Sequence, residues 1–130
     1  MILDSSAVLA IVFGEPGFEV FASIIAKTVS CSISAATLVE TVIVAESRGG
    51  DRGVRHTDSL FRNANVSIQP VTAEQAYIAC QAFSTFGRGR HPAGLNFGDC
   101  FSYALAKSTG EPLLFKGDDF RKTDILSALT

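Results

Sequence analysis

The 130-residue sequence predicts an α/β fold with a parallel sheet, because short apolar strands alternate with segments of helical length. Three such pairs are clear: strand 2–3 before helix 5–13, strand 29–34 before helix 35–48, and strand 66–71 before helix 72–86. Helical connections between parallel strands place the helices on the faces of the sheet. Residues 1–130 contain no linker, repeat or low-complexity tract, so we expect a single domain with its own core.

Each element has its own signal in the sequence. Helix 5–13 ends at Gly14 and Pro16, and helix 35–48 ends at the pair Gly49–Gly50, because glycine and proline interrupt helices. Thr72 is expected to cap the helix that it opens. In chain order we expect strand Ile2–Leu3, helix Ser5–Phe13, helix Gly17–Lys27, strand Val29–Ser34, helix Ala35–Arg48, helix Gly53–Asn63, strand Val66–Val71, helix Thr72–Phe86, a Gly/Arg loop to Gly98, helix Asp99–Ser108, strand Pro112–Phe115 and a final apolar segment Ile125–Leu129.

The composition narrows the function classes. A net charge of −2 argues against a protein that coats nucleic acid by bulk attraction. The charged fraction is low, 18% against 47% apolar residues, which favours a face used for self-association or for a partner. Three cysteines in apolar sequence predict buried, reduced thiols in a cytoplasmic protein. There is no basic n-region and no apolar run of roughly 18 residues, so we expect neither a signal peptide nor a membrane span.

Acidic residues stand where the apolar segments end or the helices begin. Asp4 closes the first strand, and the pair Asp118/Asp119 follows the last strand. Glu40 lies one to two turns into the helix after the second strand, and Asp99 opens the helix after the long loop. Sites in open α/β sheets form at the carboxyl ends of strands. The sequence therefore predicts one carboxylate cluster assembled from distant parts of the chain.

Each of these residues also has a purely structural interpretation. Asp4 could cap the helix at Ser5, Thr37 and Glu40 could form a capping box, Asp99 could complement a helix dipole, and Asp118/Asp119 could be turn residues.

Together, the carboxylates favour a metal site. Glu40 and Asp99 have apolar neighbours and no Lys or Arg within a helical turn, so burying them costs several kcal/mol unless something pairs with them. Clustered carboxylates repel one another, and a hard divalent cation such as Mg²⁺ or Mn²⁺ removes that repulsion.

The other candidate chemistries are weaker. The chain has no nucleophilic Ser or Cys in a recognisable setting, no Gly-rich phosphate loop after a strand, and no Cys/His metal spacing that would suit zinc. Arg88, Arg90 and His91 lie in the long loop before Asp99. They are either an ordinary surface loop or a basic rim that holds phosphates beside the acidic pocket.

Four motifs resemble the PIN-domain ribonucleases, and most of all the VapC toxins of bacterial VapBC toxin–antitoxin modules. They are the opening M-I-L-D-S-S-A, the helix A-A-T-L-V-E, the run G-L-N-F-G-D-C-F-S-Y-A-L-A, and the ending P-L-L-F-K-G-D-D-F-R-K-T-D. The resemblance covers the whole chain in order and is most specific between Gly87 and Phe120. It implies a three-layer α/β/α PIN-like domain with a central parallel sheet. It also implies a Mg²⁺- or Mn²⁺-dependent endoribonuclease, the toxin of a type II toxin–antitoxin system, which cuts RNA required for translation and is inhibited by a cognate VapB-type antitoxin.

Carried over by position, the resemblance assigns roles to individual residues. The catalytic carboxylates fall on Asp4, Glu40, Asp99 and Asp119, with Asp4 and Asp99 as the direct metal ligands. Where many PIN domains have a further Asp after the last strand, this chain has Gly117, so Asp118 remains an alternative to Asp119. The residues expected to contact the substrate are Ser6, Arg88, Arg90, His91 and Asn96.

The partners follow from composition and resemblance together. The stretch Phe13–Ile43 is unusually apolar for a small monomer, which predicts a homodimer. A helix of the antitoxin could occupy a groove there and direct an Arg or Lys toward the carboxylates.

Two other function classes compete with the nuclease. A phosphotransfer receiver or Asp-dependent phosphatase also gathers carboxylates at a sheet edge, but Asp4 has no second Asp two residues on and Lys116 is only a weak phosphate-holding candidate. A non-catalytic PIN module would bind RNA or protein only. The filled acidic positions argue against that reading.

Overall fold

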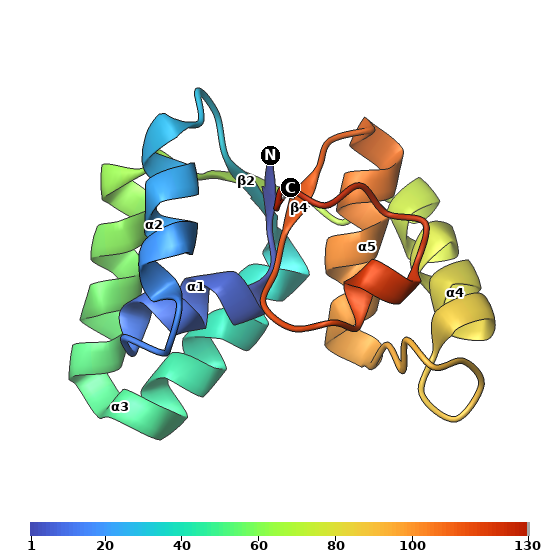
Figure 1. The fold of residues 1–130 in the computed structure, drawn as a ribbon, viewed down its shortest axis with the longest axis horizontal. Helices are drawn as coiled ribbons and strands as arrows, with labels where there is room; N and C mark the ends of the chain where they lie inside the picture. Colours follow the sequence, from blue (N-terminus) through green and yellow to red (C-terminus); the bar gives the residue numbers. More distant parts are fainter. Residues whose placement is uncertain (130) are drawn as a thin grey trace.

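The computed structural model describes residues 1–129, in which a four-stranded parallel sheet separates two groups of helices (Figure 1). The strand order is β3-β2-β1-β4, and every pairing is parallel. In Figure 1 the helices α1, α2 and α3 lie on one side of the sheet, and α4 and α5 lie on the other. The predicted three-layer α/β/α architecture is therefore confirmed.

The elements are β1 (Ile2–Leu3), α1 (Ser5–Val12), α2 (Phe18–Lys27), β2 (Ser32–Ser34), α3 (Ala35–Asn63), β3 (Ser67–Gln69), α4 (Ala73–Phe86), α5 (Phe97–Thr109), β4 (Leu113–Leu114) and the 3₁₀ helix η1 (Phe120–Lys122).

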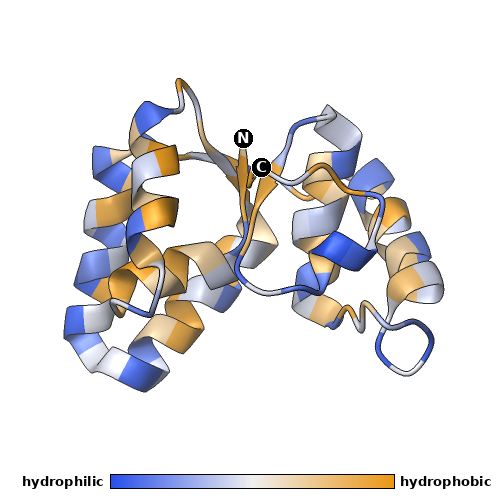
Figure 2. Cartoon of the chain, viewed as in Figure 1, coloured by the Kyte–Doolittle hydropathy of each residue, from blue (hydrophilic) through white to orange (hydrophobic). Residues whose placement is uncertain are grey.

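The sheet divides the interior into two hydrophobic cores. Successive side chains of a strand point to opposite faces, so Ile2 and Leu113 join the core under α4 and α5, while Leu3 and Leu114 join the core under α1 and α2. All four side chains are fully buried. Figure 2 shows these strands, and the sides of the helices that face them, as hydrophobic. Helices on both faces explain why β1 and β4 are continuously apolar, whereas β2 and β3 each place one isoleucine between polar residues.

The long helix α3 corrects the predicted break at Gly49–Gly50. The two expected helices, 35–48 and 53–63, are one element with a kink at Gly50, whose φ of 57° and ψ of −149° are accessible mainly to glycine. The glycine pair therefore bends the helix without ending it.

The helix predicted to open at Asp99 begins two residues earlier. Asn96 caps α5, so Asp99 occupies the third helical position. Thr72 caps α4 as predicted, its hydroxyl accepting a hydrogen bond from the Gln75 N–H at 3.1 Å.

The remaining differences concern strand length and burial. The strand β1 has the predicted bounds, whereas β2, β3 and β4 are shorter than predicted, and Val29 lies fully exposed outside β2. The final apolar segment extends the sheet beside β4, where the Leu113 N–H donates to the Leu126 carbonyl at 2.9 Å.

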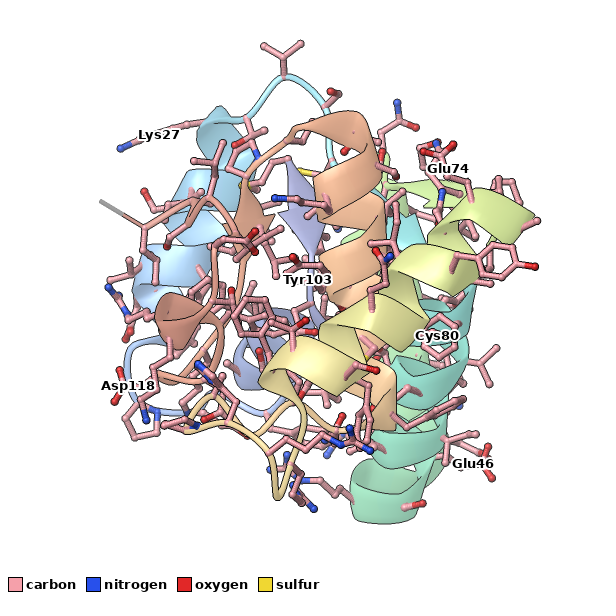
Figure 3. The ribbon with its side chains drawn as sticks, turned by 90° about the vertical axis from the view of Figure 1, so that its right-hand side faces the viewer. Lys27, Glu46, Glu74, Cys80, Tyr103 and Asp118 are labelled. Carbon is pink, nitrogen blue, oxygen red and sulfur yellow. The ribbon has the colours of Figure 1, made fainter. Side chains whose placement is uncertain are left out.

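The cysteines are free thiols in the described part of the chain. Cys31 and Cys100 are buried as predicted, whereas the prediction is wrong for Cys80, which is exposed on α4 (Figure 3). No helix within residues 1–129 combines the length and hydrophobicity that crossing a membrane requires.

The close approach of the two halves of α3 gives a first prediction. Gly53 is buried just beyond the kink, and a Cβ at this position would collide with the carbonyl oxygen of Ala45. Alanine in place of glycine normally stabilises a helix interior by about 1 kcal/mol. We expect Gly53→Ala instead to lower the free energy of unfolding by roughly 1–3 kcal/mol, because overpacking against backbone outweighs the helix propensity. Urea denaturation measures the change, with the exposed Ser59→Ala in the same helix as control. A Gly53→Ala variant as stable as the wild type would contradict this packing.

Candidate active site

Asp4 anchors the site at the carboxyl end of β1. It is only 2% exposed, and its neighbours are hydrogen-bond donors without charge. Its Oδ2 accepts from the Ser6 hydroxyl at 2.6 Å and from the Ser6 N–H at 3.0 Å, so Asp4 caps α1. Its Oδ1 accepts from the Ser102 hydroxyl of α5 at 2.6 Å. Asp4 is thus both a helix cap and a buried anion with a fixed orientation.

Asp99 is fixed by a capping box at the start of α5. The Asn96 side chain accepts from the Asp99 N–H at 2.9 Å, and Asp99 Oδ2 accepts from the Asn96 N–H at 3.0 Å. One carboxylate oxygen is therefore used in the cap. The structural interpretation of Asp99 is correct, and it leaves Oδ1 available.

Glu40 reaches the same place from α3. A Cβ at Gly98 would overlap the Glu40 carboxylate, so Glu40 lies directly against the first turn of α5, beside Asp99. The alternative capping box of Thr37 and Glu40 is wrong. Helix α3 begins earlier, with Ser34 as its cap, and Thr37 is buried with its Oγ1 3.2 Å from the Ser102 hydroxyl.

The electrostatics bring the four carboxylates into one group. Burial is the main reason that the pKa of Asp99 rises to about 6. The Asn96 N–H opposes this rise, and the negative charges of Asp4, Glu40 and Asp119 add to it. Burial likewise raises the pKa of Glu40, against a hydrogen bond from Ser5 and with a contribution from Asp4. No cation is among these causes, so the group carries uncompensated negative charge.

Asp119 and Asp118 have different surroundings. The Asp118 side chain is 83% exposed, stands 3.9 Å from Arg121, and projects from the outer edge of the molecule in Figure 3. Asp119, but not Asp118, acts on the pKa of Asp99. Gly117 makes the intervening turn with a φ of 96°. Both aspartates are exposed, and the effect of Asp119 on the pKa of Asp99 is what favours it as the fourth member of the carboxylate group.

The carboxylate group is not a ready-made chelate. Within residues 1–129, no three or more His, Cys, Asp or Glu side chains stand where they could hold a metal ion as they are. The donor chemistry nevertheless fits a hard divalent cation, since the group offers only oxygen ligands and its charge is uncompensated. Asp4 and Asp99, from β1 and α5, are the two residues whose carboxylates would hold it.

Three of the predicted substrate contacts have structural tasks. The Ser6 hydroxyl donates to Asp4 and accepts from the Lys116 N–H at 2.9 Å. Asn96 caps α5. The His91 ring packs edge-on against Phe86, with its Nδ1 accepting from the backbone at Ala93.

Arg88 and Arg90 are exposed in the loop that precedes α5. The Arg90 guanidinium lies 5.8 Å from the centroid of the Phe83 ring. For both arginines, the role in a basic rim that holds phosphates stays a prediction.

The sequence analysis missed Ser102 and Gly98. Ser102 is fully buried in α5 and orients Asp4, and Gly98 makes room for Glu40. The available signal was a lone hydroxyl in an apolar helix, three residues after Asp99, which must find a polar partner when buried.

The comparisons with known proteins agree with this geometry. The model of the PIN domain family matches residues 1–126. "Ribonuclease VapC" of Mycolicibacterium smegmatis is 48% identical over 125 residues, which cover 96% of this chain and 97% of the relative. "Ribonuclease VapC30" of Mycobacterium tuberculosis is 46% identical and covers 96% of this chain and 95% of its own. The chain belongs to the VapC ribonucleases of the PIN domain family.

Solved structures of VapC proteins share the fold. The M. tuberculosis VapC20 structure, described as a sarcin-ricin loop cleaving toxin, aligns with a TM-score of 0.79 at 19% identity, over 96% of this chain and 95% of the other. The Rickettsia felis VapBC2 structure, bound to a promoter DNA fragment, aligns with a TM-score of 0.75 at 12% identity, over 97% and 94%.

The raised pKa of Asp99 predicts a pH-dependent cost to stability in the metal-free VapC fold. Between pH 4 and 6 the folded protein holds a proton that the unfolded chain releases, so stability falls as pH rises through this window and stays reduced above it. Asp99→Asn removes the charge but keeps an oxygen for the cap. In EDTA we expect it to be more stable than the wild type at pH 7.5, with the difference shrinking toward pH 4. Denaturant titrations at several pH values measure this, with the exposed Asp51→Asn as control. Equal stability of wild type and Asp99→Asn at pH 7.5 would contradict the repulsion.

Proposed function

We propose that this chain is a divalent-metal-dependent endoribonuclease that acts in the cytoplasm as the toxin of a VapBC-type module. One observation carries the proposal: carboxylates from β1, α3, α5 and the turn after β4 act on one another without a compensating cation. The membership in the VapC ribonucleases supports RNA as the substrate and a VapB-type antitoxin as the partner.

Each carboxylate has a distinct task in this proposal. Asp4, held by Ser6 and Ser102, presents a fixed anionic ligand, and Asp99 presents its free oxygen from the first turn of α5. Glu40 and Asp119 complete the pocket, either directly or through water. A bound Mg²⁺ or Mn²⁺ would supply a water of lowered pKa and neutralise charge on the scissile phosphate.

The competing functions fit the structure less well. A phosphotransfer receiver pairs its aspartate with a second Asp two residues on, whereas here that position is Ser6, whose hydroxyl donates to Asp4. A module that only bound RNA or protein would have no need to bury Asp99 beside three further carboxylates that add to the rise of its pKa.

The adjacent aspartates provide the sharpest test of the site. We expect Asp99→Asn and Asp119→Asn to lower RNA cleavage at least about a hundredfold, because each removes a carboxylate from the pocket. Asp118→Asn should stay within about twofold of the wild type, because its side chain is exposed and outside the group.

A fluorogenic RNA with Mg²⁺, with Mn²⁺ and with excess EDTA measures the rates, and circular dichroism checks the fold. Cleavage that persists in EDTA, or an Asp99→Asn variant as fast as the wild type, would overturn the proposed function. Equal losses in the two neighbouring variants would overturn only the assignment of Asp119.

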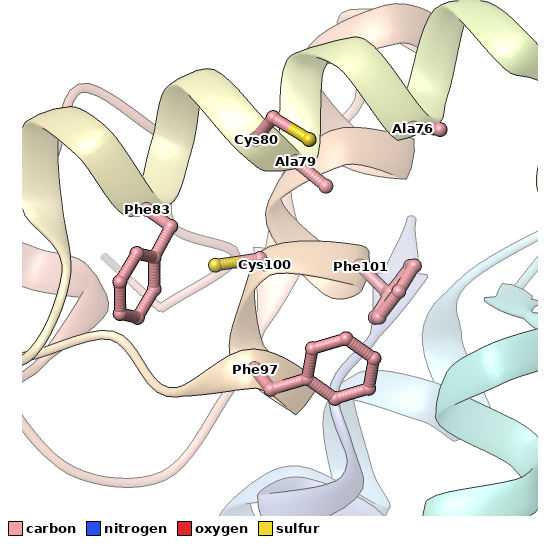
Figure 4. A pocket seen from close by; sticks show the side chains of 7 residues that line it. All are labelled: Ala76, Ala79, Cys80, Phe83, Phe97, Cys100 and Phe101. Atoms are coloured by element: carbon pink, nitrogen blue, oxygen red, sulfur yellow. The ribbon is translucent and has the colours of Figure 1, made fainter.

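We further propose a homodimer, but through a different face from the predicted stretch Phe13–Ile43. A cavity of about 520 Å³ opens between α4 and α5 (Figure 4). Nearby on the same helices, the large side chains of Tyr77 and Phe97 are 75% and 78% exposed. In a twofold-symmetric dimer the same surface of each protomer meets its copy, so that surface must carry both the side chains that project and the recess that receives them. This face has both. The cavity is lined by Ala76, Ala79, Cys80, Phe83, Phe97, Cys100 and Phe101.

Ala76→Arg tests the dimer. Arginine is a good helix former, so the fold should persist, while its charge blocks an apolar contact at the cavity. We expect a monomer by sedimentation velocity, whereas the wild type and the control Gln81→Arg, on another part of α4, remain dimeric. A monomeric wild type, or a dimer that survives Ala76→Arg, would contradict this face.

A further inference from the structure

Two basic side chains share one carboxylate beside the active site. Glu15, in the turn between α1 and α2, accepts from Lys116 Nζ at 2.7 Å through one oxygen and from Arg48 at 3.0 Å through the other. Together the two cations lower the pKa of Glu15, Lys116 most of all. The other ion pairs of the described residues match one cation to one carboxylate. The Glu15 group alone carries a net positive charge.

The group is tied to the catalytic carboxylates through the backbone. The N–H of Lys116 donates to the Ser6 hydroxyl at 2.9 Å, and the same hydroxyl donates to Asp4 at 2.6 Å. The backbone of Lys116 is therefore linked to the buried Asp4 through the Ser6 hydroxyl, while the Lys116 side chain extends to Glu15.

Arg48 comes from the helix that carries Glu40. It lies eight residues further along α3, or about 12 Å at the rise of an α-helix. Its guanidinium stacks on the Phe13 ring at 4.1 Å, which keeps it in place while its edge remains open. The cations therefore stand beside the carboxylates and not among them.

Both cations have N–H donors that Glu15 does not use. The Lys116 and Arg48 side chains are 38% and 46% exposed, whereas Glu15 is 23% exposed. An ammonium has three N–H donors and a guanidinium has five, and each gives one hydrogen bond to Glu15. Glu15 thus holds two like charges together and leaves most of their donors free for an anion.

We propose that Lys116 and Arg48 bind a phosphate of the RNA backbone that flanks the one being cut. This rests on the proposed ribonuclease function. The acidic pocket repels the substrate's phosphates, and a net-positive group about two helical turns from Glu40 binds the strand where that repulsion has faded. The two residues are binding residues for the substrate and do not touch the reacting atoms.

Lys116→Gln and Arg48→Gln test this site. Because the contacts are solvent-exposed, we expect each to raise the KM for a single-stranded RNA roughly three- to fivefold with kcat unchanged. Each should also reduce the slope of log KM against log salt concentration by about 0.7, and the double variant by about 1.4, because each removes one phosphate contact. Lys107→Gln breaks a comparable lysine–carboxylate pair, with Asp124, and serves as the matched control with unchanged KM and slope.

The outcomes separate this inference from the proposed function. If Asp99→Asn abolishes RNA cleavage but Lys116→Gln keeps the wild-type KM and salt slope, the proposed ribonuclease function stands and the proposed phosphate site is wrong. If Lys116→Gln weakens the binding of the antitoxin but leaves the KM for RNA unchanged, the group is a protein contact, which also overturns the inference. A fall in kcat at constant KM would contradict a flanking role.

Discussion

The site depends on negative charge that is held in place without being neutralised. Asp4 is buried at the end of β1, and its hydrogen-bond donors are two hydroxyls and one backbone N–H. Such donors replace water and make burial tolerable, yet they leave the full charge in place. The backbone N–H of Asn96 likewise donates to Asp99, whose pKa is raised mainly by burial and further by the neighbouring carboxylates. A protein that needed these residues only as helix caps would gain nothing from gathering them.

The fold concentrates this charge because of its connectivity. Parallel strands end at one edge of the sheet, so β1 and β4 present Asp4 and the turn of Asp119 on the same side. The helices add Glu40 and Asp99 from either face of the sheet, and the Glu40 carboxylate lies so close to Gly98 that a Cβ there would force the Glu40 side chain to move. Ser102 then joins α5 to β1 through Asp4. The polar contacts that orient the site are therefore also contacts between the layers.

The fold and the acidic residues could be predicted from sequence because both follow from local patterns. Apolar runs with helical connections specify a parallel sheet, and polar residues after strand ends specify its functional edge. What could not be predicted depends on tertiary packing. Gly49–Gly50 is a strong stop signal, but α3 packs against α1 and continues, with the Phe13 ring close to both Gly49 and Gly53 on either side of the kink. Ser102 and Gly98 are ordinary residues until the partner that faces each of them is known. The apolar stretch Phe13–Ile43 is divided between interior and surface: Phe21, Ile25 and Ile33 are buried, whereas Val20, Val29, Val39 and Ile43 are more than half exposed. Sequence alone does not separate these two sets, nor does it predict that Tyr77 of α4 and Phe97 of α5 are exposed.

An acidic pocket on a protein of net charge −2 must still attract a polyanion, and the distribution of charge shows how this is possible. Exposed charges act over about a Debye length, roughly 8–10 Å in physiological salt. A local excess of positive charge therefore matters more for RNA binding than the net charge of the protein. Arg88 and Arg90 lie in the loop before α5, and the turn that contains Glu15 lies on the other side of the end of β1 (Figure 1). Basic side chains therefore stand on two sides of the carboxylates. An RNA strand that crossed from one to the other would pass its phosphates over the acidic centre, where the proposed cation would compensate the negative charge. Binding and cutting then use different residues, so affinity can be tuned at the rim without disturbing the carboxylates.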